Sequence, residues 1–159
     1  MSQLPTVAAV ASQLKAVGIA LPPGNVRVDG YGDTPALSQA LIELIRTGKK
    51  RAGTGLLWAY EYDNQPIAQV GDIEIVVDFN LQPVLVTRIT QVDIIPFNQV
   101  SADYAAVEGE GDGSLEYWKT GHWVFFSREC KRIGRTPEPT MPVICSQFEV
   151  IATVPTSAA

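Results

Sequence analysis

Residues 108–130, EGEGDGSLEYWKTGHWVFFSREC, hold the side chains of this sequence that are best suited to chemistry. Glu108, Glu110 and Asp112 alternate with glycines, and His122 is the only histidine of the chain. Carboxylates and imidazoles transfer protons in enzymes when their surroundings adjust their pKa values. Acidic residues also stabilise a helix N-terminus, but that role accounts for one or two carboxylates and not for three. The excess favours a functional site here.

A second candidate for a site is the basic, glycine-containing segment TGKKRAGTGLLW, residues 47–58. Its cations, together with the arginine just before it, are Arg46, Lys49, Lys50 and Arg51. Backbone N–H groups and cations at such a turn are suited to bind an anion. The segment lacks the Gly-Lys-Ser/Thr ending of a phosphate-binding loop. A solvated basic helix end that leads into a strand is the alternative interpretation.

Residues 114–132 have the spacing of a helix that packs one face inward. Asp112 or Ser114 is suited to cap its N-terminus. At 100° per residue, that face carries Leu115, Trp118, His122, Phe125, Phe126, Glu129 and Ile133. The side chains that we expect to be largely buried are Leu115, Trp118 and Phe125. A buried polar group without a partner costs about 1–3 kcal/mol, so His122 either bonds within the core or belongs to a site. Glu129 is expected to have a structural role, in a salt bridge or with its stem packed inward.

The same reasoning predicts three further helices, over residues 6–17, 34–47 and about 101–109. Thr34 can cap the second of these helices, Pro35 suits its first turn, and Gly48 suits its end. The expected apolar stripe of that helix is Leu37, Leu41, Leu44 and Ile45.

Strands are predicted over about residues 56–62, 70–97 and 143–154, where β-branched or alternating residues are frequent. The first of these segments ends in a turn at Asp63 and Asn64. In the second segment, which holds two or three strands, Ile73, Ile75 and Val77 share one face. We expect an antiparallel sheet that curls into a barrel to hide its edges. The fold class is therefore α+β.

Length and composition limit the remaining choices. The 159 residues fit one domain, with an N-terminal helical extension over residues 1–27 and a frayed tail over 155–159. The net charge of −5 restricts nucleic-acid binding to a local basic patch. No apolar run is long enough to span a membrane, and we expect a cytoplasmic protein. Cys130 and Cys145 have no metal-ligand spacing, so we expect reduced thiols and no metal or cofactor. Monomer and dimer both remain open.

The segments YGDTPALSQALIELIRTGKKRAGTGLLWAYE and EGEGDGSLEYWKTGHWVFFSREC together resemble the bacterial branch of the ASCH (ASC-1 homology) domain family. The resemblance covers about residues 28–150. It implies a PUA-like fold, a small antiparallel β-barrel flanked by helices, and a role in binding RNA or a nucleoside or nucleotide. The family carries a Gly-x-Lys signature after the second helix, and here Lys50 takes the signature position.

The resemblance also implies two hydrolytic activities that some members of the family have. One is a ribonuclease, and the other removes the acetyl group of N4-acetylcytidine with a Lys, Thr and Glu set. The matching lysine is Lys50, and the carboxylate is Glu108 or Glu110. Gly53 occupies the position expected for the threonine. Thr54 follows it, and a shift of one residue in a strand turns a side chain to the other face.

Three functional hypotheses follow from these residues. In a binding module, Lys49, Lys50 and Arg51 hold phosphate while Trp58 or Tyr60 stacks on a base, and His122 lies at the ligand. In a metal-independent hydrolase, Lys50 and Glu108 or Glu110 act as acid and base, and Thr54 or Ser127 supplies a hydroxyl. The alternative is a non-catalytic partner-binding domain with a vestigial cleft.

Overall fold

The computed structural model describes residues 3–155, and it separates into two compact units. The first unit contains the chain up to Gly48, Val70–Thr90, and the chain from Phe148 onward. The second unit contains Lys49–Gln69 and Gln91–Gln147. The basic and acidic segments singled out above both belong to the second unit. Residues 156–159 of the tail predicted to fray lie outside the described residues.

The first unit is built on four strands or parts of strands, with helix α1 (Val7–Ala16) packed on them. Its other elements are β1 (Val26–Gly30), α2 (Pro35–Arg46), β3 (Ile73–Val77), the start of β4 (Pro83–Pro96) and the end of β5 (Pro142–Thr153). β3 pairs in parallel with β1 and antiparallel with β4. Its residues Ile73, Ile75 and Val77 pack together with Val10 and Leu14 of α1, which confirms their predicted shared face.

Helix α2 begins and ends where the sequence predicts, but its buried face is different. The Thr34 hydroxyl accepts a hydrogen bond from the Leu37 N–H, and Pro35 is the first helical residue. The buried side chains are Ser38, Ile42 and Ile45. Leu37 is 43% exposed, so its place in the predicted stripe is wrong. Leu37 directly precedes Ser38 in the helix, so its side chain is rotated about 100° away from that of Ser38 and lies beside the buried face.

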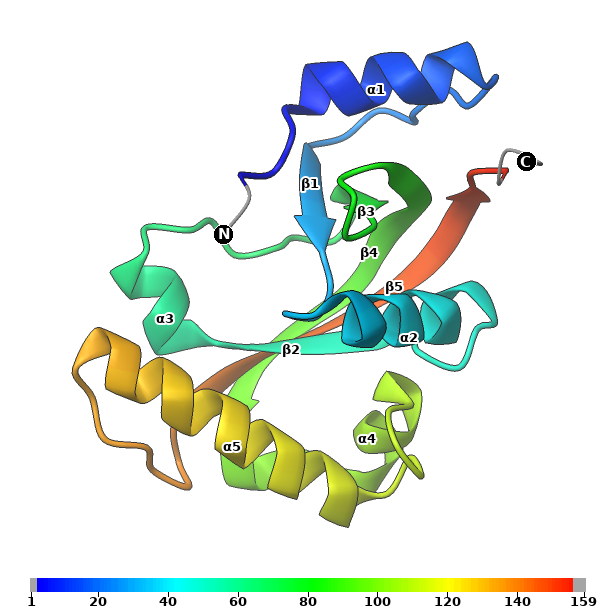
Figure 1. Ribbon diagram of the computed structural model, residues 1–159. Helices are drawn as coiled ribbons and strands as arrows, with labels where there is room; N and C mark the ends of the chain where they lie inside the picture. Colours follow the sequence, from blue (N-terminus) through cyan, green and yellow to red (C-terminus); the bar gives the residue numbers. More distant parts are fainter. Residues whose placement is uncertain (1–2, 156–159) are drawn as a thin grey trace. The chain divides into compact units, whose positions relative to one another are not determined.

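The second unit surrounds a short two-stranded ladder with three helices. Its elements are β2 (Ala52–Leu56), α3 (Leu57–Tyr62), the rest of β4, a 3-10 turn η1 (Phe97–Gln99), α4 (Ala102–Glu108), α5 (Leu115–Ile133) and the rest of β5. β2 pairs antiparallel with β5, so that Thr54 lies opposite Cys145. α5 packs against α3 and α4, and both of these shorter helices contact β2 (Figure 1).

The predicted α+β class is confirmed by this mixture of helices and one sheet. The hydrogen-bonded strand order is β1-β3-β4-β5-β2. The β1–β3 pair is parallel, which the expectation of an antiparallel sheet did not include. Within residues 3–155, no helix is both long enough and apolar enough to cross a bilayer.

The predicted strand over residues 56–62 is wrong beyond Leu56, because Leu57–Tyr62 forms helix α3. An apolar run this short fits either a strand or a helix, and periodicity alone does not separate the two. Leucine, alanine and glutamate within it favour a helix. The predicted turn is present, with Asp63 as the C-cap and Asn64 in a left-handed conformation at φ 53°.

The core of the second unit confirms part of the predicted α5 face and corrects the rest. Trp118 is 4% exposed, as predicted, and it packs with Phe97 and with Phe126 in one apolar cluster. Leu115 is half-buried against this cluster. Phe125 is 44% exposed, so its predicted burial is wrong. The buried side chains of α5 are Trp118, Phe126, Cys130 and Ile133, and this set places Phe125 beside the core face.

Candidate functional site

Gly109 brings the acidic segment against the basic one. The backbone N–H of Arg51 donates to the carbonyl oxygen of Val107 at 2.9 Å. Gly109 ends α4 with φ +69°, and a Cβ built on it would lie only 1.9 Å from the carbonyl oxygen of Lys49. Only glycine allows so close a backbone approach in this conformation. The contact places the start of β2 beside the carboxylates that flank Gly109.

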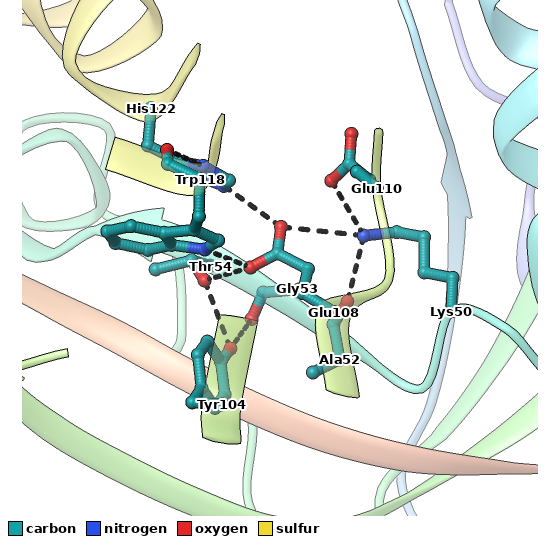
Figure 2. A network of polar contacts seen from close by, with 9 residues as sticks. All are labelled: Lys50, Ala52, Gly53, Thr54, Tyr104, Glu108, Glu110, Trp118 and His122. Atoms are coloured by element: carbon teal, nitrogen blue, oxygen red, sulfur yellow. Dashed lines mark hydrogen bonds and ion pairs between the residues drawn. The ribbon is translucent and has the colours of Figure 1, made fainter. Parts of the chain in front are cut away.

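Glu108 is the centre of the resulting polar network (Figure 2). Its side chain is 2% exposed, and donors surround both of its oxygens. Oε1 lies 2.9 Å from Nε2 of His122 and 3.5 Å from Nζ of Lys50. Oε2 accepts from Oγ1 of Thr54 at 2.7 Å and from Nε1 of Trp118 at 2.6 Å. Two contacts to each oxygen use the acceptor positions of an ionised carboxylate.

Lys50 lies between the two glutamates and is itself buried, at 2% exposure. Its Nζ donates to the Ala52 carbonyl oxygen at 2.8 Å and to Oε2 of Glu110 at 3.0 Å, in addition to its contact with Glu108. These three acceptors match the three N–H groups of an ammonium. Glu110 is the exposed member of the trio, since 29% of its side chain is accessible. The network therefore opens to solvent beside Glu110.

Thr54 faces this network, contrary to the expectation that the one-residue shift would turn it away. Its hydroxyl donates to Glu108 and lies 3.0 Å from the hydroxyl of Tyr104. The Tyr104 hydroxyl donates to the Gly53 carbonyl oxygen at 2.9 Å. Gly53 occupies the other face of β2, where a Cβ would meet no atom within 4 Å. The hydroxyl therefore enters the site from the position after the one expected.

His122 stacks on the indole ring of Trp118 one helical turn earlier. The ring centroids are 4.2 Å apart and the planes differ by 17°. The imidazole contacts an oxygen through each nitrogen, since Nδ1 lies 2.9 Å from the Trp118 carbonyl oxygen and Nε2 contacts Glu108. The structure combines the two predictions made for His122, because the residue has hydrogen-bond partners in the core and also belongs to the polar network.

The two glutamates have opposite pKa shifts. Burial alone would raise the pKa of Glu108, but the hydrogen bond from His122 and the charge of Lys50 outweigh burial and lower it. Burial raises the pKa of Glu110, and its contact with the ionised Glu108 adds to that rise against the opposing effect of Lys50. Burial and the charge of Glu108 also raise the pKa of Tyr104, which keeps its proton. When two neighbouring carboxyl groups have pKa values that are shifted apart in this way, the group with the higher pKa is suited to exchange protons.

Glu108, Glu110 and His122 each offer one atom to a group whose members lie within 4.8 Å of one another. It is the only such metal-compatible group in the part of the chain that the structure describes. The same atoms already bind the ammonium of Lys50 and the donors around Glu108. A metal ion would compete with Lys50 for these oxygens, so the arrangement fits ion pairing and proton transfer better than metal binding.

The other predicted site residues lie around or away from the network. Lys49 and Arg51 are exposed on either side of Lys50. Trp58 is half-buried beneath the Arg135 guanidinium, which lies 3.8 Å from its ring. The Tyr60 ring is half-buried and lies over Gly55, where an added Cβ would be 2.6 Å from it. These two rings are therefore less open to a base than the binding hypothesis requires.

The hydroxyl of Ser127 is not joined to the network. Ser127 lies on α5 beyond His122, and among residues 3–155 it makes no hydrogen bond to the network residues. Asp112 is also outside the network and accepts from the backbone N–H of Ser114, which is the N-cap of α5. Glu129 has the predicted structural role, because it pairs with Arg132 at 2.9 Å.

Sequence reasoning missed Tyr104 and the polar role of Trp118. A usable signal exists for both, because side chains four residues apart on a helix are neighbours. Tyr104 precedes Glu108 by four residues on α4, and Trp118 precedes His122 by four on α5. Each pair presents one aromatic and one titratable side chain on the same face.

The comparisons with known proteins point to one family. The model of the ASCH domain family matches residues 28–152. The chain is similar to an ASCH domain from Lactobacillus crispatus JV V101, with a TM-score of 0.75 and 34% identity over 79% of each chain. It is also similar to a protein from Enterococcus faecalis V583 assigned to the family DUF984, with a TM-score of 0.73 and 28% identity over 88% of this chain and 83% of that one. No curated protein sequence matches. The shared fold confirms the predicted PUA-like class.

Proposed function

Because this chain belongs to the ASCH domain family, we propose that it binds an RNA or nucleoside ligand and hydrolyses an acyl amide on the ligand's base. The reaction centre is the polar network of Lys50, Thr54, Tyr104, Glu108, Glu110, Trp118 and His122, called the Lys50 network below. One observation carries the proposal. Glu108 contacts both the Thr54 hydroxyl and the Lys50 ammonium, which unites the Lys, Thr and Glu set implied by the family resemblance.

Lys50 is suited to bind the acyl oxygen of a substrate. Its three N–H groups are all in use, and its partner Glu110 is the exposed one. A carbonyl oxygen that takes the place of Glu110 on Nζ would receive a charge-assisted hydrogen bond. That bond strengthens as negative charge develops on the oxygen in the transition state.

Glu110 is suited to carry the proton through the reaction. Its raised pKa makes it a stronger base when it is ionised, and therefore better able to take a proton from water. In the proposed reaction, Glu110 removes a proton from water while the water oxygen bonds to the acyl carbon. The carbon–nitrogen bond then breaks, and Glu110 returns the proton to the nitrogen. The products are a carboxylic acid and the free amine of the base, so atoms and charges balance.

Thr54 and Glu108 hold the reacting groups in place in this scheme. The lowered pKa of Glu108 makes it a poor proton acceptor. The hydroxyl of Thr54 gives its one proton to Glu108 and lies 3.0 Å from the hydroxyl of Tyr104. A lone pair of its oxygen can then orient the attacking water or the amide N–H. Outside the network, the exposed Lys49 and Arg51 are placed to contact a phosphate of a longer RNA.

The test is turnover of N4-acetylcytidine, followed by chromatographic separation of cytidine and acetate, after exhaustive treatment with a metal chelator. We expect turnover that survives the chelator and is lost in Lys50→Met and Glu110→Gln. The matched controls are Lys15→Met and Glu116→Gln, which change exposed residues outside the Lys50 network and should keep wild-type rates.

Three other outcomes would overturn the proposal. Cleavage of a single-stranded RNA in place of deacetylation would assign the Lys50 network to a ribonuclease. Salt-sensitive RNA binding without any turnover would leave a binding module. Activity that the chelator abolishes, and that zinc or manganese restores, would assign the glutamates and the histidine to a metal centre.

A further inference from the structure

Both ring nitrogens of His122 face oxygen atoms that accept hydrogen bonds and have no proton to give. Nδ1 lies 2.9 Å from the carbonyl oxygen of Trp118, and Nε2 lies 2.9 Å from Oε1 of Glu108. A backbone carbonyl is an acceptor only, so Nδ1 must carry a proton. An ionised carboxylate is also an acceptor only, so Nε2 must carry one as well. A neutral imidazole has a single proton and satisfies only one of these contacts.

We propose that His122 is a half-buried imidazolium that keeps Glu108 ionised and so reserves the proton-carrying role in the Lys50 network for Glu110. His122 acts through Glu108 and is therefore a positioning residue. Its role as a cation follows from geometry and from proton counting. The catalytic consequence, the division of labour between the two glutamates, rests on the proposed function.

The competing arrangement places the shared proton on Glu108 and leaves His122 neutral. Three donors oppose it, because each stabilises the charged form of Glu108. Thr54 and Trp118 both donate to Oε2, and the ammonium of Lys50 lies 3.5 Å from Oε1. A carboxyl group that receives several such donors is favoured in its ionised form. The ion pair between His122 and Glu108 is therefore the arrangement that satisfies every contact.

The aromatic surroundings of His122 also suit a cation. The Trp118 ring stacks on it at 4.2 Å, and the ring of Phe126 lies 5.6 Å away. The negative face of an aromatic ring attracts a cation that has lost part of its water. The side chain of His122 is only 15% exposed, so that attraction is weakly screened. The indole thus contributes to both members of the ion pair, through its N–H to Glu108 and its ring to His122.

The charged side chains of the network around His122 come from three segments of the chain. Glu108 ends α4, Glu110 follows it, and Lys50 precedes β2, while Tyr104 of α4 stays neutral. With both glutamates ionised, the two cations and two anions cancel. When Glu110 takes a proton from water, one net positive charge remains in the network. That charge matches the negative tetrahedral intermediate that forms in the same step.

The test uses the fact that His122 is the only histidine of the chain. Labelling with ¹⁵N-histidine gives the two ring-nitrogen signals of this residue without further assignment. We expect both nitrogens to show the shifts of protonated imidazolium nitrogens at pH 7.5, together with two slowly exchanging ring N–H protons. Signals of a neutral ring, with one protonated and one bare nitrogen at pH 7.5, would overturn the proposal.

Variants separate the ion pair from a general effect on structure. In Glu108→Gln the carboxylate is lost, and we expect His122 to become neutral at pH 7.5. Glu110→Gln keeps the carboxylate of Glu108, so the imidazolium signals should persist. Glu116→Gln is the matched surface control and should leave the spectrum unchanged. Persistence of both protonated-nitrogen signals in a folded Glu108→Gln protein would show that Glu108 does not hold the charge.

Kinetics test the positioning role once turnover is established. In His122→Gln, one donor to Glu108 can be kept while the charge is lost. We expect a loss in kcat larger than any rise in KM, and a changed acidic limb of the pH profile, because Glu108 then competes for the proton. An unchanged pH profile in a folded His122→Gln enzyme would overturn this role. The NMR spectra need no substrate. An absence of turnover would therefore contradict the proposed function, while the spectra would still determine the charge of His122.

Discussion

The hydroxyl of Thr54 donates to Oε2 of Glu108 across 2.7 Å, although 54 residues separate the two in sequence. The bond joins the middle of β2 to the last residue of α4. It exists because Thr54, and not Gly53, is on the face of β2 that meets α4. This single contact assigns the hydroxyl of the candidate site, a choice that the order of residues left open between Thr54 and Ser127.

The hydroxyl assignment predicts different outcomes for two similar substitutions. Thr54→Val keeps the shape of the side chain but removes the donor to Glu108. We expect deacetylation of N4-acetylcytidine to fall at least about tenfold, a smaller loss than the roughly 10²–10³ for a donor in direct contact with the reacting oxygen. Ser127→Ala should leave the rate within about twofold, because this hydroxyl does not reach the network. Equal losses in the two variants, measured as kcat/KM, would show that the assignment is wrong.

The backbone contact at Gly109 predicts that even a methyl group there disturbs the site. In Gly109→Ala the new Cβ would meet the Lys49 carbonyl oxygen at 1.9 Å, so backbone must move. We expect a loss of more than about 2 kcal/mol in the free energy of unfolding, since the left-handed conformation alone costs about 1–2 kcal/mol.

Gly113 offers the matched control for this steric effect. It also has a positive φ, +77°, but a Cβ there would meet nothing within 4 Å. Gly113→Ala should therefore show the conformational cost alone, and a smaller loss than Gly109→Ala. Chemical denaturation of both variants measures the difference. If the two losses agree within error, the approach of Gly109 to Lys49 does not hold the segments together.

Trp118 predicts separate costs for its ring and for its N–H. Trp118→Phe keeps an aromatic ring but leaves Glu108 without one of its donors, which should cost about 1–3 kcal/mol. Trp118→Ala also opens a cavity beside Phe97 and should cost about 3–5 kcal/mol. The control is Trp123→Phe, because the indole of Trp123 does not donate to Glu108. Urea titration of the three variants tests this order, and a Trp118→Phe protein as stable as wild type would contradict it.

Glu74 of β3 predicts that the protein becomes less stable as pH rises through neutrality. Burial, together with the charges of Asp29 and Asp72, raises the pKa of Glu74 from 4.5 to about 7 against the opposing charge of Arg27. A raised pKa means that the folded protein binds this proton more tightly than the unfolded chain does. The stabilisation is fully present below about pH 4.5 and is lost as pH rises through about 7.

Glu74→Gln is the test, because a neutral amide mimics the protonated side chain. The shift corresponds to on the order of 3 kcal/mol between the ends of the window. We expect the variant to lack that part of the pH dependence and to exceed wild type in stability at pH 8.5. Glu43→Gln, at an exposed position on α2, should follow wild type. Parallel stability curves for Glu74→Gln and wild type between pH 5 and 8.5 would exclude this role for Glu74.

The sequence by itself determined the features that depend on neighbouring residues. Thr34, Pro35 and Ser114 set helix starts through local capping, and these starts are where the structure has them. The alternation of Ile73, Ile75 and Val77 predicted a shared strand face for the same reason. The carboxylates at residues 108–112 exceed what one helix start requires, and cations cluster at residues 49–51. These two features marked both halves of the Lys50 network.

Only the tertiary structure decided which side chains meet. Leu57–Tyr62 reads equally as strand or helix, and packing selects the helix. Phe125 and Phe126 are adjacent phenylalanines that the sequence places on the same helix face, yet of these two only Phe126 is buried in the core. Trp118 reads as a core residue in the sequence, but its indole N–H completes the shell of donors around Glu108. The facing of Thr54 toward Glu108 and the two acceptors of His122 depend on contacts between α4, α5 and β2. No local pattern encodes such contacts, because they are set by how the backbones approach one another.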